Sequence, residues 1–95
     1  MSTESDLLRI LARLDLPAAA EAVLRERFAD SVDLAKAGEP GIALENVCDN
    51  LFEFEVMLDV MSHRQLRDLC LRHGVSGHRI DLLNSRVVGA RGFDG

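Results

Sequence analysis

The chain has 95 residues, of which 47% are hydrophobic and 28% are charged, and its formal net charge at neutral pH is −5. This length predicts a single domain that buries roughly 60–65% of the surface of its unfolded chain, which leaves little material for an elaborate active-site cleft. Charged residues interrupt every long apolar stretch, so the sequence excludes a membrane-spanning helix and a secretory signal, and we expect a cytoplasmic protein.

Apolar residues recur at helical spacing along most of the chain and predict five helices and no strand. The expected ranges are about 5–14, Pro17 to about Ala37, Pro40 to about Val60, Ser62 to Gly74, and a last helix from about Ser76. Short connections between them favour antiparallel neighbours. The expected fold class is therefore all-α, a compact bundle of about five helices that forms a single helical domain over residues 1–88. Residues 89–95 contain three glycines and no periodicity, and are expected to be a mobile tail.

Capping patterns set the expected helix boundaries. Thr3 with Asp6 should cap the first helix, and Ser62 with Gln65 should cap the fourth, because such pairs satisfy amides that a first helical turn leaves unpaired. A Gly-Glu-Pro-Gly turn over residues 38–41 should separate the second and third helices, since glycine favours the end of a helix and proline favours its first turn.

The third predicted helix carries two distinct faces. Its apolar stripe consists of Leu44, Val47, Cys48, Leu51, Phe54 and Leu58. Glu45, Asp49 and Glu53 are spaced four residues apart and therefore line a neighbouring face. Like charges at this spacing weaken a helix by about a few tenths of a kcal/mol per pair. A basic partner docked on this face would offset that cost.

The same helix, with the turn before it, resembles part of a known family. The resemblance is carried by Gly38-Glu39, Ala43-Leu44-Glu45, Val47-Cys48-Asp49-Asn50, Leu51 and Glu53. This pattern is similar to that of small helical immunity proteins from bacterial contact-dependent growth-inhibition and Maf-type polymorphic toxin systems, the MafI-like and CdiI-type group. The resemblance is loose over the rest of the chain. It implies a protein that neutralises a cognate toxin domain by stoichiometric binding.

The distribution of charge bears on the partner. Residues 1–60 carry five basic and thirteen acidic residues, whereas residues 61–95 carry six arginines and three aspartates. An acidic body repels phosphate and attracts a basic protein, and many nuclease toxins are basic because they hold nucleic acid. We therefore expect a basic toxin domain, with a nuclease as the candidate, and neither nucleic acid nor a membrane as partner. The expected toxin-binding residues are Glu45, Asp49, Asn50, Glu53 and Glu55, with Glu39 and Asp59 at the rim.

Residues 66–86 favour an alternative function, that of a small helix-turn-helix DNA-binding regulator. Cys70 occupies the position of the small residue, Gly74 the turn and Val75 the apolar position that this motif requires. The residues that would then face the DNA groove are Ser76, His78, Arg79, Asn84 and Arg86. The acidic remainder of the chain opposes contact with phosphate, so this function ranks second.

Cysteine and histidine residues do not form a recognisable metal or catalytic motif. Cys70 and His73 have ligand-like spacing, but the paired Cys-x-x-Cys motif of structural zinc sites is missing. Cys48 and Cys70 lie on apolar stripes, so we expect both to be buried, reduced thiols. A phosphate-binding loop is also missing, because the glycine-containing turn at residues 38–41 places a carboxylate where a phosphate would approach. We therefore expect no enzymatic activity, no cofactor and no bound metal.

Overall fold

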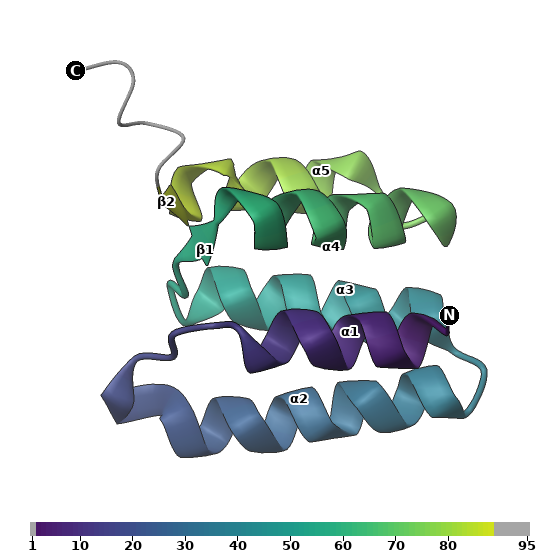
Figure 1. The fold of residues 1–95 in the computed structure, drawn as a ribbon, viewed down its shortest axis with the longest axis horizontal. Coiled ribbons are helices and arrows are strands. Elements are labelled where there is room, and N and C mark those ends of the chain that lie inside the picture. The colour runs from purple at the N-terminus through teal and green to yellow at the C-terminus, as the bar shows by residue number, and fades with distance from the viewer. Residues whose placement is uncertain (1, 89–95) are drawn as a thin grey trace.

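The computed structural model describes residues 2–88, which form a bundle of five helices with a small two-stranded sheet at one end (Figure 1). The all-α prediction is confirmed. The tail predicted over 89–95 lies outside the described residues. The elements are α1 (Thr3–Ala12), η1 (Ala18–Ala20), α2 (Glu21–Lys36), α3 (Pro40–Glu53), β1 (Leu58–Asp59), α4 (Val60–Arg72), α5 (Gly77–Leu82), η2 (Leu83–Arg86) and β2 (Val87–Val88), where η denotes a 3-10 turn.

Helix α3 is the centre of the bundle. It packs against α2, α4 and α5, while α1 lies on one side of the bundle and contacts α2 and α4 (Figure 1). The short α5 packs on both α3 and α4. The polar side of α3 is therefore confined to the strip that α2 and α5 leave uncovered.

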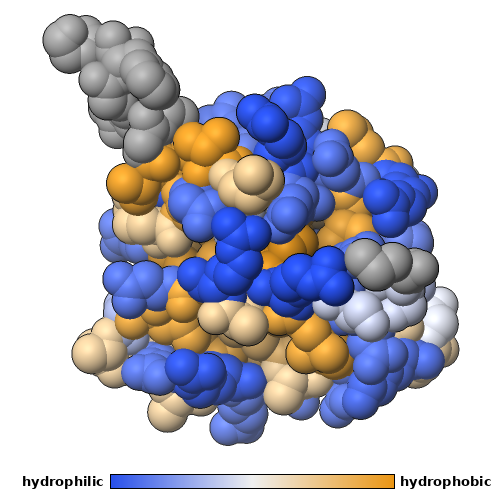
Figure 2. Space-filling model, in the orientation of Figure 1, coloured by the Kyte–Doolittle hydropathy of each residue, from blue (hydrophilic) through white to orange (hydrophobic). Residues whose placement is uncertain are grey.

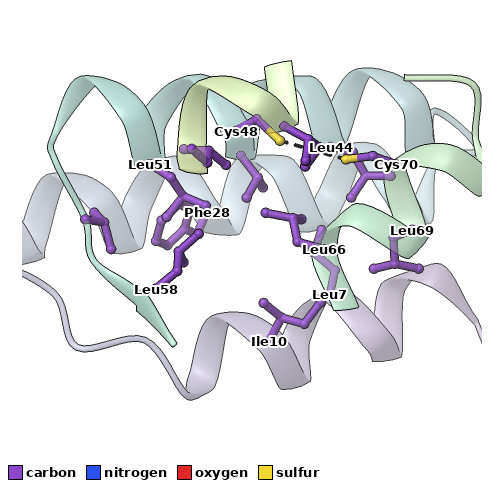
Figure 3. Close-up of a cluster of buried hydrophobic side chains, with 14 of the residues drawn as sticks. Leu7, Ile10, Phe28, Leu44, Cys48, Leu51, Leu58, Leu66, Leu69 and Cys70 are labelled. Carbon is purple, nitrogen blue, oxygen red and sulfur yellow. Dashed lines mark hydrogen bonds between the residues drawn. The ribbon is translucent and has the colours of Figure 1, made fainter. Parts of the chain in front are cut away.

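One hydrophobic core joins all five helices (Figure 3). The predicted stripe of the third helix is confirmed for its first four members, all of which are buried. Phe54 is partly buried against the core, and Leu58 is buried from β1 instead of from a helix. The buried apolar residues of the other helices are Leu7, Ile10, Leu24, Phe28, Val32, Leu66, Leu69, Cys70 and Ile80.

Two helices end at the predicted glycines. Gly38 after α2 and Gly74 after α4 have φ angles of 87° and 72°, a left-handed conformation that glycine adopts without a steric cost. After α4, the Val75 amide donates to the Cys70 carbonyl at 2.9 Å, and an equivalent bond closes α2. These bonds satisfy carbonyls that the helix ends would otherwise leave unpaired.

The predicted extension of the third helix to Val60 is wrong, because α3 ends at Glu53 and the chain then turns. Glu55 has a φ angle of 53° and takes the left-handed position that glycine fills in the other two turns. The Val56 amide donates to the Leu51 carbonyl at 2.9 Å, and the Val56 side chain is fully buried. This bond and the burial of Val56 hold a left-handed residue that carries a side chain.

Replacing Glu55 with glycine should therefore stabilise the fold. A left-handed residue with a Cβ costs roughly 1–2 kcal/mol relative to glycine, so we expect Glu55→Gly to raise the free energy of unfolding by about 1 kcal/mol. A urea titration measures this change. The matched control is Glu26→Gly in the middle of α2, which should lower stability by about 1 kcal/mol. A destabilised Glu55→Gly variant would contradict the assignment of this turn.

The sequence predicts no strand, yet β1 and β2 pair in parallel, with Leu58 opposite Val87 and Asp59 opposite Val88. Each strand has only two residues, which is too short for the alternation of apolar and polar residues to be recognised. Leu58 and Val87 are both buried, so the pairing holds β2, at the end of the described chain, next to β1 and the start of α4. Apolar side chains also reach the surface near β2 (Figure 2).

The predicted caps of the first and fourth helices are wrong by up to three residues. Ser2 caps α1, where its hydroxyl accepts a hydrogen bond from the Ser5 amide at 3.1 Å. Asp59 caps α4, where its carboxylate accepts a hydrogen bond from the Ser62 amide at 2.6 Å. Ser62 lies fully buried inside the first turn instead. The pairing of β1 brings Asp59 to the position from which it caps the helix.

Candidate functional site

Helix α3 aligns the predicted acidic residues as their spacing requires. The side chains of Asp49 and Glu53 are 61% and 63% exposed, and Glu45 is half-buried one turn earlier. All three follow one side of the helix because four residues span slightly more than one turn. The strip is therefore accessible at its centre and at its C-terminal end.

The accessible part of this strip forms one wall of a groove between α2 and α3. The groove has a volume of about 550 Å³. Its walls carry four carboxylates and a single cation, so its lining is strongly acidic. The lining residues are Glu26, Arg27, Asp30 and Ser31 from α2, and Asn46, Asp49, Asn50 and Glu53 from α3. Sequence analysis identified only the α3 wall.

The floor of the groove is polar, and its hydrogen bonds are satisfied. Asn50 is only 8% exposed. Its amide nitrogen donates to the Asn46 carbonyl at 2.8 Å, and its side-chain oxygen accepts a hydrogen bond from Arg27 at 3.1 Å. Ser31 is buried, and its hydroxyl donates to the Arg27 carbonyl at 3.1 Å. Asn50, predicted as a toxin contact, thus serves first to join the two helices.

Arg27 is the cation that organises the groove. Besides its bond to Asn50, its guanidinium lies 3.8 Å from the Glu53 carboxylate and 5.5 Å from the centre of the Phe54 ring. Its side chain is half exposed, so the ion pair with Glu53 is largely screened and serves to orient both side chains. No sequence pattern singled out Arg27, because its partners lie on another helix.

A second arginine reaches α3 from the opposite side. Arg79 of α5 donates a hydrogen bond to the Asp49 carboxylate, and this contact raises the pKa of Arg79. Asp49 therefore belongs both to the groove and to the joint between α3 and α5. Two of the predicted acidic contacts thus have an arginine partner within the protein: Arg79 for Asp49 and Arg27 for Glu53.

The remaining predicted residues lie away from the groove. Glu39 precedes the first turn of α3 and Glu55 follows its last turn, and both are exposed. A 14-residue helix is about 20 Å long, so these two residues mark opposite ends of the face. Asp59 caps α4 and lies 3.7 Å from Arg13 near the end of α1. The structure gathers Asp49, Asn50 and Glu53 in the groove. The groove lining does not include the other predicted contacts, which are Glu39, Glu45, Glu55 and Asp59.

The role of Asp59 as a helix cap has a measurable consequence. The hydrogen bond from the Ser62 amide lowers the pKa of the Asp59 carboxyl. The stabilisation is therefore present above the ordinary pKa of 3.8 and is lost as the pH falls through the lowered value. Replacing Asp59 with alanine should cost about 1 kcal/mol at neutral pH, and the difference from the wild type should shrink in acid. Melting curves of the variant and the wild type, recorded at neutral pH and in acid, measure the difference in stability. Asp59→Asn, which retains a capping oxygen, is the milder control. A deficit in Asp59→Ala that is unchanged in acid would contradict this account.

The segment considered for DNA binding contains the expected turn, but the two arginines expected to face the DNA are both bound to α3. Gly74 and Val75 form the turn, and α5 has only six residues before the chain tightens into η2. Arg79 is bound to Asp49. Arg86 lies 4.8 Å above the Phe52 ring and donates to the Phe52 carbonyl at 3.4 Å. Both arginines therefore face α3 and not an approaching DNA groove.

The two cysteines are buried, as predicted. Within residues 2–88, no group of three or more histidine, cysteine, aspartate or glutamate side chains is placed to hold a metal ion. None of the described helices has the length and apolar content that crossing a bilayer requires.

Comparison with known protein families, characterised proteins and solved structures finds no match to this chain.

Proposed function

We propose that this protein is an immunity protein that neutralises a cognate bacterial toxin by binding a basic surface of the toxin in the groove between α2 and α3. The observation that carries the proposal is the groove lining, which sets four carboxylates against one arginine. The resemblance of residues 38–53 to MafI-like and CdiI-type immunity proteins supports the same function. It covers the α3 wall of this groove.

The electrostatics favour a basic protein as the occupant. Glu26 and Asp30 on α2 face Asp49 and Glu53 across the groove, so an incoming cation would meet carboxylates from both helices. The molecule as a whole carries a charge of −5, which accelerates the encounter with a basic partner and opposes contact with phosphate. Arg27 makes the groove uneven in charge. A partner that places a carboxylate beside Arg27 and cations elsewhere would fit it best.

The expected toxin is the C-terminal domain of a large secreted protein encoded immediately upstream of this chain. Co-expression of that domain with this protein should restore growth that the domain alone abolishes. The purified complex should contain one copy of each chain by light scattering. Toxicity that persists despite folded, co-expressed protein would refute the proposal, and so would an upstream gene that belongs to a metabolic operon.

DNA binding is tested in parallel. Because Arg79 and Arg86 contact α3, we expect no change in anisotropy when labelled duplex DNA is titrated with the protein at low salt, the condition that favours phosphate contacts most. Salt-sensitive binding that Arg79→Ala and Arg86→Ala weaken would favour the regulator function instead.

A further inference from the structure

Two cysteine sulfurs meet inside the core, away from the groove. Cys48 comes from α3 and Cys70 from α4, and the two residues are 2% and 0% exposed. Their sulfur atoms lie 3.8 Å apart, with one thiol donating to the other (Figure 3). The helices that carry them already pack together. Burial among apolar side chains explains each cysteine singly, but it does not require their sulfurs to be in contact.

We propose that Cys48 and Cys70 form an oxidisable dithiol, which a small peroxide converts into an intramolecular disulfide between α3 and α4. A disulfide has an S–S length of about 2.05 Å, so the sulfurs need to approach by less than about 2 Å. Side-chain rotation and a small shift of two adjacent helices can supply this movement. The buried position also separates the pair from thiols of other molecules, which favours an internal bond.

Hydrogen peroxide is the oxidant, and the reaction requires no other reactant. Donation of the Cys48 thiol hydrogen lowers the pKa of Cys70, so Cys70 is the thiol that ionises first. The Cys70 thiolate attacks one peroxide oxygen, the O–O bond breaks, and the departing hydroxide takes up a proton to become water. Cys48 sulfur then attacks the sulfenic Cys70 sulfur, the S–O bond breaks, and a second water leaves with the Cys48 proton. Two thiols and one peroxide thus yield one disulfide and two waters.

Helix α5 packs beside the two helices that carry the pair, α3 and α4. Its Ile80 belongs to the same buried cluster as the two cysteines. The bond from Arg79 to Asp49 ties α5 to the residue that follows Cys48. A helix of six residues is less than two turns long, and such a short element opens more readily than the rest of a core. We therefore infer that peroxide reaches the sulfurs when α5 lifts.

Peptide mapping of the peroxide-treated protein tests the proposal. Folded wild-type protein is exposed to hydrogen peroxide, its remaining thiols are alkylated in denaturant, and it is digested without reductant. We expect one cross-linked species joining the Cys48 and Cys70 peptides in a monomeric protein, with a melting temperature several degrees higher than that of the reduced protein. The map separates this product from oxidation of the exposed Met57 and Met61. Two alkylated cysteines, cysteines oxidised beyond the sulfenic state, or disulfide-linked dimers would each overturn the proposal.

Two further variants test the route of access. Arg79→Ala removes the tie on α5 and should speed cross-linking several-fold. Arg25→Ala removes an ion pair within α2, at 2.7 Å from Glu21, and should leave the rate unchanged. Equal rates in the two variants would overturn the role of α5. Cys48→Ala should give no cross-linked species, and the wild-type measurement does not depend on whether that variant folds.

Discussion

Reversing the charge of Glu26 and Asp30 should abolish protection against the cognate toxin and leave the fold intact. Both side chains are exposed on the α2 wall of the groove, and no ion pair joins either to another residue within 2–88. Glu26→Lys with Asp30→Lys leaves two carboxylates facing three cations. A basic partner would then meet like charge, so we expect binding to weaken by orders of magnitude. The melting temperature should change little, because exposed substitutions usually alter stability by less than about 0.5 kcal/mol.

The control must change the net charge equally without touching the groove. Asp15→Lys with Asp81→Lys does so, since both aspartates are exposed and lie outside the groove lining. Survival of cells that co-express the toxin domain reports function, and calorimetric titration of the purified pair reports affinity. The control should protect as the wild type does, with at most a slower association. Full protection by the folded groove variant would show that the toxin binds elsewhere.

The sequence alone would have directed this experiment at Asp49 and Glu53. The structure places Arg79 beside the first and Arg27 beside the second. Reversal of either would set a lysine against an arginine, so a loss of protection could reflect a disturbed fold. The α2 carboxylates give the cleaner test.

Helical periodicity was enough to predict the bundle, because each helix buries a stripe that local spacing reveals. Leu44, Val47 and Leu51 are buried as that spacing requires. The end of α3 was missed because Glu55 takes a left-handed position where glycine is expected. The strands were missed because a strand of two residues is too short to show an alternation of apolar and polar residues. For the strands, a long-range contact between β1 and β2 decided the local structure.

Only the α3 wall of the candidate site could be predicted, because the α2 wall depends on contacts between residues far apart in the chain. Charge spacing identified Asp49 and Glu53 on one helix. It could not pair them with α2, since the contact of Arg27 with Asn50 spans 23 positions in the chain and that of Arg79 with Asp49 spans 30. Which side chains face a groove depends on helix packing, and packing order does not follow from the pattern of a single sequence.

Replacing Leu51 with alanine should destabilise the domain more than any exposed substitution. Leu51 is fully buried on the central helix and points into the same cluster as Phe28 and Leu58 (Figure 3). Its carbonyl also closes the turn after α3 by accepting the Val56 amide. Truncation to alanine loses transfer free energy and leaves a cavity, which together cost about 2–5 kcal/mol. That is a large share of the roughly 5–15 kcal/mol that stabilises a typical domain.

The matched control is the same substitution at Leu71, which is 58% exposed on α4. Leu71→Ala deletes the same atoms without opening a cavity, so its effect should stay within about 0.5 kcal/mol. Urea titrations of the three proteins give the two differences directly, provided that the slopes agree and unfolding remains two-state. Equal losses in the two variants would mean that Leu51 does not occupy the core. Because α3 bears one wall of the groove, we also expect Leu51→Ala to lose protection only at temperatures where it unfolds, whereas the groove variant should lose protection while folded.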